Sequence, residues 1–167
     1  MTITRTLTGL AVAAAALVAI APAAAQASTG ASDAVTTASS SSFSGWGTYY
    51  APGRRAKAAG SLSATGEDHE VIPTADTVKI SGKVTDLTRG SSCGLAVFRI
   101  TYLDDTGNLP FKHHTVRDCT YGSPKSFSFK YPDVYEVELK ICSEAKSSKP
   151  SLNCLYAGTW KVIYLSK

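Results

Sequence analysis

Apolar and polar residues alternate with a period of two in several short segments between residues 77 and 165. In the segment 77–85, Val78, Ile80 and Val84 share one side, and polar residues occupy the other. This alternation is typical of a β-strand that buries one face and exposes the other. The segment 95–103 is apolar on both sides, which predicts a central strand covered on both faces.

Three further segments, 126–130, 135–141 and 160–165, continue the alternation. The first two are separated by Tyr131-Pro132-Asp133 (residues 131–133), which predicts a turn between two strands. No segment shows a sustained helical period. Short strands joined by turns favour an all-β fold, and we expect a small antiparallel β-sandwich with immunoglobulin-like or Greek-key connections.

The N-terminal part has a different composition. An apolar run at 10–21 precedes the small residues Ala25 and Ala27, as in a secretory signal peptide covering 1–27. That run is too short to span a bilayer. Residues 28–44 are rich in Ser, Thr and Ala and predict a disordered linker, so we expect the folded, secreted domain to cover 45–167.

Cysteine usage agrees with export. The chain has four cysteines, and an even number in an exported protein implies disulfides. In a symmetric hairpin, the numbers of opposed residues average to the turn centre. Cys93 and Cys119 average to 106, inside a polar turn, and Cys142 and Cys154 average to 148, inside a polar loop. We therefore predict two disulfide-stapled hairpins, Cys93–Cys119 and Cys142–Cys154.

The formal net charge of +4 is spread along the chain, with its densest group at Arg54, Arg55 and Lys57. A nucleic-acid binder would show a concentrated basic stripe with interleaved aromatic residues. We therefore expect neither nucleic-acid binding nor, once the signal peptide is removed, a membrane partner.

Several motifs together resemble a group of uncharacterised small secreted proteins of filamentous actinobacteria with a two-disulfide layout. They are Gly45-Trp46-Gly47-Thr48-Tyr49-Tyr50 with Lys57-Ala58, then Arg117-Asp118-Cys119-Thr120-Tyr121-Gly122-Ser123 with Lys125-Ser126-Phe127, then Val137-x-Leu139-x-Ile141-Cys142, and Cys154 shortly before Trp160. The resemblance covers most of the expected domain. The resemblance implies a secreted β-rich protein, and it indicates no particular activity.

Two features are candidate binding sites. Trp46, Tyr49, Tyr50 and Tyr121 could form an aromatic platform for a sugar or a peptide. The alternative is the loop 143–153, which contains Lys146 and Lys149 and is closed by a disulfide. Secreted protease inhibitors present such preorganised loops, because preorganisation reduces the entropy lost on binding.

The ionisable residues predict neither a catalytic nor a metal site. Residues 67–70 (Glu-Asp-His-Glu) are consecutive and read as a solvated loop. His113 and His114 are neighbours that face opposite sides of a strand, and we expect His113 to pair with Asp104 or Asp105.

Two strand carboxylates, Glu136 and Glu138, alternate with apolar residues, so we expect them on the exposed face. No nucleophile-elbow motif occurs, and the cysteines are committed to disulfides. The sequence therefore predicts a secreted, monomeric, non-catalytic module without cofactor that binds an extracellular protein or cell-wall component. A protease inhibitor is the second hypothesis and an enzyme of unrecognised type is the third.

Overall fold

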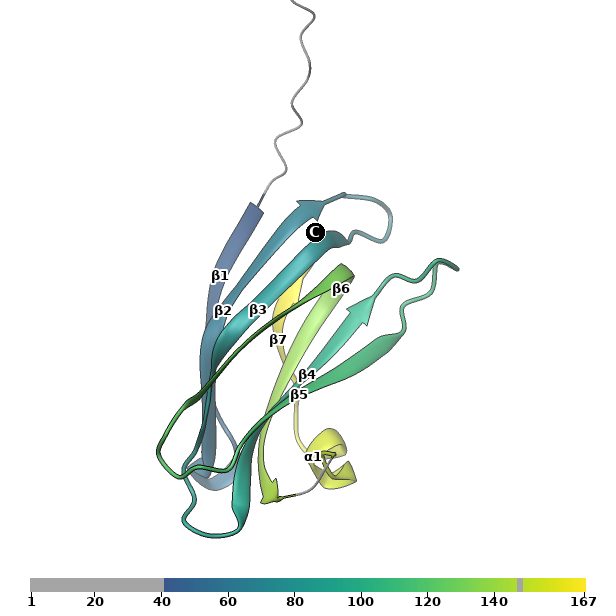
Figure 1. The fold of residues 1–167 in the computed structure, drawn as a ribbon. Helices are drawn as coiled ribbons and strands as arrows, with labels where there is room; N and C mark the ends of the chain where they lie inside the picture. Colours follow the sequence, from purple (N-terminus) through teal and green to yellow (C-terminus); the bar gives the residue numbers. More distant parts are fainter. Residues whose placement is uncertain (1–40, 147–148) are drawn as a thin grey trace, which may run out of the picture. The chain divides into compact units, whose positions relative to one another are not determined.

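The computed structural model describes residues 41–146 and 149–167, and strands dominate this part of the chain (Figure 1). The seven strands are β1 (Ser41–Tyr50), β2 (Ala56–Glu67), β3 (Ala75–Asp86), β4 (Ser92–Tyr102), β5 (Phe111–Asp118), β6 (Lys125–Ala145) and β7 (Lys161–Leu165). Two short helical turns, η1 (Pro52–Arg54) and α1 (Leu152–Tyr156), complete the described structure. The all-β, antiparallel prediction is confirmed. Within the described residues, no helix is long and apolar enough to cross a membrane.

Strand β6 joins the two halves of the sheet. Its first half pairs with β3, which continues to β2 and β1, and its second half pairs with β4, which continues to β5. Val134 pairs with both Ala75 of β3 and Tyr102 of β4, so these two strands flank β6 on opposite edges. β7 pairs with residues 136–139 of β6.

The predicted turn at residues 131–133 is therefore wrong, because β6 runs through it as one strand. Asp133 has a positive φ of 52°, and the pairing with β4 shifts register next to it. Pro132 lies at this irregularity, where a strand tolerates the missing N–H. The residues 131–133, whose composition is typical of a turn, instead lie where β6 bends and changes its pairing partner.

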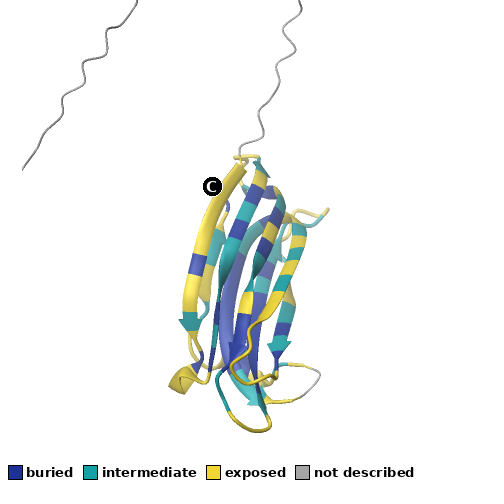
Figure 2. Ribbon diagram, turned by 60° about the vertical axis from the view of Figure 1, so that its left-hand side comes forward, coloured by how far each residue is buried: buried dark blue, intermediate teal, exposed yellow. Residues whose placement is uncertain are grey.

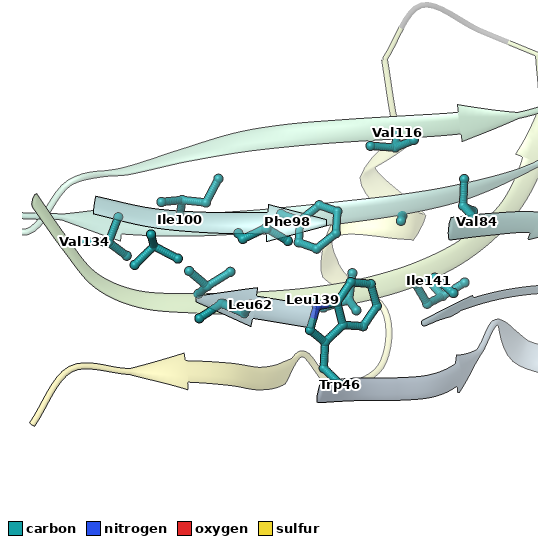
Figure 3. Packing of buried hydrophobic residues seen from close by; sticks show 14 of the residues in the cluster. Trp46, Leu62, Val84, Phe98, Ile100, Val116, Val134, Leu139 and Ile141 are labelled. Carbon is teal, nitrogen blue, oxygen red and sulfur yellow. The ribbon is translucent and has the colours of Figure 1, made fainter. Parts of the chain in front are cut away.

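The main core combines buried side chains of β1, β2 and β3 with those of β4 and β6, and Figure 3 shows part of this packing. Buried positions recur along these strands in Figure 2. Ala96, Phe98 and Ile100 of β4 point into this core, whereas Leu95 and Val97 point to a second, smaller cluster on the other face. The prediction of a central strand apolar on both faces is confirmed, because β4 lies between β6 and β5.

Two glycines make room for the largest core side chain. The Trp46 indole reaches over Gly60 and Gly82, which are cross-strand partners in β2 and β3, and stacks on Phe127 at 6.2 Å. A Cβ on Gly60 would lie 2.5 Å from the indole and 2.0 Å from the Ser81 carbonyl oxygen. Strand glycines of this kind mark close approach of neighbouring groups.

Three Asp-x-Thr sequences end strands or form the turns between them. Asp86, Asp104 and Asp118 each accept a hydrogen bond from the backbone N–H two residues later, at 2.9, 3.0 and 3.0 Å. Asp86 and Asp118 are buried, and the Asp118 carboxylate also accepts the backbone N–H of Asp86 at 3.1 Å. These side chains supply the acceptors that the backbone needs where the ladders stop.

Both predicted disulfides are present, with Cα–Cα distances of 4.2 Å for Cys93–Cys119 and 5.9 Å for Cys142–Cys154. The first extends the register of the β4–β5 hairpin, as predicted. The second does not staple a hairpin, because Cys154 lies in α1 and β7 pairs further along β6, with Leu139 opposite Lys161. Ser151 caps a helical turn there, which displaces the returning strand.

The start of the folded part also differs from the expectation. β1 begins at Ser41 and pairs with Thr65 of β2, so residues 41–44 belong to the sheet and not to the expected linker. The expected signal peptide and the rest of the expected linker lie outside the described residues.

Gly60→Ala should lower the free energy of unfolding by about 1–3 kcal/mol, because the new methyl group would overlap the indole and a β3 carbonyl. Gly45→Ala is the matched control, since its Cβ would meet only the Gly60 carbonyl oxygen at 3.9 Å. Urea unfolding of both variants checks the difference. Equal stability of the two would show that the Trp46 packing is described wrongly.

Acid should destabilise the domain partly through His114. Its ring stacks on Phe129 with centroids 3.8 Å apart, and burial lowers the pKa of this imidazole. The unfolded chain, with a pKa of about 6.5, then binds more protons, so the free energy of unfolding falls as the pH drops below about 6.5. His114→Phe should flatten the fall in melting temperature between pH 7.5 and pH 5. An unchanged fall would contradict this assignment.

Candidate functional site

A cleft of about 610 Å³ opens between the end of β1 and the second half of β6. One wall is Thr48–Pro52 together with Arg55, the second is Leu139–Glu144 of β6, and the third comes from the segment that carries α1 (Asn153, Cys154, Ala157, Gly158, Thr159 and Lys161). The volume falls within the range of small-ligand sites in proteins.

The cleft meets β6 at its edge. Six consecutive residues of this strand, 139–144, line it. Because successive side chains of a strand point to opposite faces, an unbroken run can line a cleft only when the strand is presented edge-on. β7 covers the same edge as far as Leu139 and no further within the described residues.

The disulfide side of the cleft is held by polar contacts as well as by the Cys142–Cys154 bond. Ser151 caps α1, its Oγ accepting from the backbone N–H of Cys154 at 3.1 Å. Ser151 also donates its backbone N–H to Glu144 at 2.9 Å and its hydroxyl to the same carboxylate. Covalent and hydrogen-bonded anchors therefore fix α1 against β6.

Lys140 anchors the chain that follows α1. Its Nζ donates to the carbonyl oxygens of Leu155 at 3.1 Å, Ala157 at 2.9 Å and Gly158 at 3.4 Å. The side chain is 6% exposed. Burial, and secondarily the positive charge of Arg99, lowers the pKa of this ammonium group. The charge of Lys140 is thus used to hold a turn whose carbonyl groups lack helical partners.

The opposite wall contains two of the predicted aromatic residues. Tyr49 packs against the main core, and Tyr50 is 42% exposed with the guanidinium of Arg54 4.4 Å from its ring centroid. Such a cation–π contact holds the ring in place at the mouth of the cleft. Tyr49 and Tyr50 therefore line the same cleft as the disulfide-anchored segment, although the sequence analysis considered these features as two separate candidate sites.

The other two aromatic residues lie elsewhere, so the four-residue platform does not assemble. Trp46 is 6% exposed and belongs to the core, where its ring is closed to a ligand. Tyr121 is 50% exposed but bridges to Asp86 and carries the guanidinium of Arg89 at 5.0 Å. Alternation alone could not separate them, because neither Trp46 nor Tyr121 lies in one of the alternating segments of the sequence.

The two lysines of the predicted inhibitory loop, Lys146 and Lys149, are exposed. Residues 147–148 between them lie outside the described part. Neither lysine lines the cleft.

The outer face of β4 and β6 departs from the sequence prediction. Glu138 is 9% exposed and pairs with Arg99, so its expected place on a wet face is wrong. Trp160 covers this face, and the Arg99 guanidinium lies 4.8 Å from its ring centroid. Burial, followed by the charge of Glu138, raises the pKa of Glu136. The disulfide draws the covering segment over a face that alternation alone assigns to solvent.

The two neighbouring histidines face opposite sides of β5, as predicted. His113 does not pair with an aspartate; its ring stacks on Trp160 at 5.7 Å with planes 2° apart. Burial and the nearby Arg99 charge lower the pKa of His113. Asp104 instead accepts the backbone N–H groups of Thr106 and Asn108, which is why it stays in its own turn.

Of the acidic segment 67–70, predicted as a loop, Glu67 is the last residue of β2 and accepts the Tyr164 hydroxyl at 2.7 Å, whereas Asp68 organises the loop that follows. The Asp68 carboxylate accepts from the backbone N–H and the hydroxyl of Thr74, both at 2.9 Å. Among the residues that the structure describes, no three His, Cys, Asp or Glu side chains come together as a metal site would require.

No protein-family model, no curated protein and no solved structure matches this chain.

Lys140→Met should lower the free energy of unfolding by roughly 1–2 kcal/mol, because the carbonyl groups of Leu155 and Ala157 lose a charged donor. Lys130→Met on the exposed part of the same strand is the control and should be nearly neutral. Urea unfolding compares the two. A Lys140→Met variant as stable as the control would exclude the anchoring role.

Proposed function

We propose that this protein is a secreted, non-catalytic binding module and that the cleft between β1 and β6 is its ligand site. The observation that carries the proposal is the cleft itself, which joins an arginine-braced tyrosine wall to a disulfide-anchored wall. Ligand sites combine a concave, largely apolar surface with a few fixed polar groups, and both walls of this cleft are fixed.

The compartment is supported by the disulfides. Two disulfides in a domain of this size fit an oxidising, extracellular environment. The apolar run at residues 10–21 and the small residues Ala25 and Ala27 that follow it support secretion.

Binding without catalysis is supported by how the ionisable groups of the cleft are used. Glu144 accepts two hydrogen bonds from Ser151, and Lys140 donates to three carbonyl oxygens. A catalytic acid or base needs a proton that it can exchange with a substrate. These two groups instead hold the wall in place, which is what a preformed binding site requires.

Tyr50→Ala/Arg55→Ala removes two exposed side chains from the cleft and should weaken ligand binding at least about tenfold. The mature protein, immobilised on beads, would be incubated with culture medium and with purified cell wall of the producing organism, and the retained material quantified. Wild type should retain a component that the variant loses.

Tyr121→Ala/Arg89→Ala is the matched control, because it also removes one exposed tyrosine and one exposed arginine, both outside the cleft, and should bind like wild type. Equal retention by the cleft variant and the control would refute the site. Turnover in a broad hydrolase screen would refute the non-catalytic assignment, and protease inhibition untouched by the cleft variant would favour the inhibitor.

A further inference from the structure

We propose that the cleft takes an extended, acidic peptide segment of a partner protein, which adds as a β-strand to the free edge of β6. This inference rests on the proposed function and names the class of ligand. Strand addition is a general mode of peptide recognition, in which main-chain hydrogen bonds supply much of the affinity.

One edge of β6 is unpaired where the cleft begins. β7 pairs with residues 136–139 and its last partner is Leu139 opposite Lys161, whereas β6 continues to Ala145. Among the described residues, no other strand pairs with this edge of 140–145. An exposed strand edge offers a row of donors and acceptors to an incoming chain.

The hydrogen-bonding register of β4 determines which backbone groups of β6 point into the cleft. Tyr102 donates its backbone N–H to Pro110, so the even-numbered residues of β4 direct their backbone groups to β5 and the odd-numbered ones to β6. Odd residues of β4 pair with even residues of β6, for example Leu95 with Cys142. The N–H and C=O groups of Ile141 and Ser143 therefore point to the opposite, open edge.

The same end of β6 carries a polar side-chain atom without a hydrogen-bond partner among the described residues. Ser143 is one of the residues that line the cleft, and its Oγ is buried and makes no hydrogen bond to any described residue. A buried hydroxyl without a partner costs free energy, so the polar groups at this end of β6 are incompletely satisfied in the free protein.

The charged side chains of the cleft indicate the charge of the peptide. The cleft is lined by Arg55, Lys140, Lys161 and Glu144. Lys140 and Glu144 are engaged with the α1 segment, whereas Arg55 and Lys161 are exposed and have no carboxylate partner among the described residues. Their two positive charges complement an acidic peptide and disfavour a basic one.

The dimensions agree with a short strand. Residues 140–145 of an extended chain span about 20 Å, at roughly 3.3 Å per residue. Recognition through Ile141 and Ser143 then involves four backbone hydrogen bonds, from one N–H and one C=O on each residue.

The test uses a phage-displayed library of random decapeptides against the immobilised wild-type protein. Enriched peptides should be acidic, and a synthetic copy should bind in fluorescence polarisation. Two N-methylated copies of this peptide would then be compared, one methylated at the odd-numbered residues and the other at the even-numbered residues. One copy should lose binding and the other should keep it, because only one edge of the peptide faces β6. Failure to enrich any peptide, or equal binding of both methylated copies and the parent, would overturn strand addition.

Charge and edge variants test the protein side. Arg55→Glu/Lys161→Glu should lose the acidic peptide and prefer its lysine-containing counterpart, whereas Lys79→Glu/Lys130→Glu, with the same change of charge on an exposed pair of β3 and β6, should bind like wild type. Unchanged binding by the first double variant would overturn the charge assignment.

Ser143→Pro removes one N–H that points into the cleft and should weaken peptide binding at least about tenfold. Ser143→Ala keeps that N–H and should lose much less of the affinity for the peptide. If Ser143→Pro fails to fold in a thermal melt, the N-methylated peptides decide the question on wild-type protein. Retention of another ligand in the cleft, with no peptide bound, would contradict strand addition and leave the binding function intact.

Discussion

The structure depends on one strand, β6, having to pair with partners on both of its edges. Its first half completes the β1–β2–β3 group, and its second half is central to the group of β4, β5 and β7. The bend at Asp133 lets one continuous strand serve both groups, which meet in a single core around Phe98. Because β7 covers only part of the second half, the remaining edge is left for the cleft.

The Cys142–Cys154 disulfide holds a cover over the second apolar face of β4, which is apolar on both faces. One face of β4 lies in the main core, and Leu95 and Val97 on the other would meet water without a cover. The segment that carries α1 supplies that cover with Cys154, Leu155 and Trp160. The same cover forms one wall of the cleft, so the site arises from the way the second face is buried.

Local patterns in the sequence predicted β3, β4, β7 and parts of β6, together with the central place of β4 and both disulfide pairings. They indicated no strand at β1 or β2, where apolar and polar residues do not alternate regularly. They failed where the outcome depends on distant segments. Tyr131-Pro132-Asp133 has turn composition, yet the two partners of β6 keep the backbone extended through it. Glu138 and Lys140 alternate like surface residues, but the disulfide brings Trp160 and the α1 segment over them. The cleft could not be predicted, because its first wall, at residues 48–55, lies more than 80 residues before the other two in the chain. The cap at Ser151, before Leu152 and three residues ahead of Cys154, was a signal for α1 that alternation does not register.

The central claim is that β6 presents a free backbone edge to the cleft. Residue-resolved amide hydrogen exchange of the folded protein tests it most directly. The account predicts slow exchange at Lys140 and Cys142, whose N–H groups pair with β4, and much faster exchange at Ile141 and Ser143. Uniformly slow exchange across residues 140–143 would contradict it, because it would show that the edge is already covered.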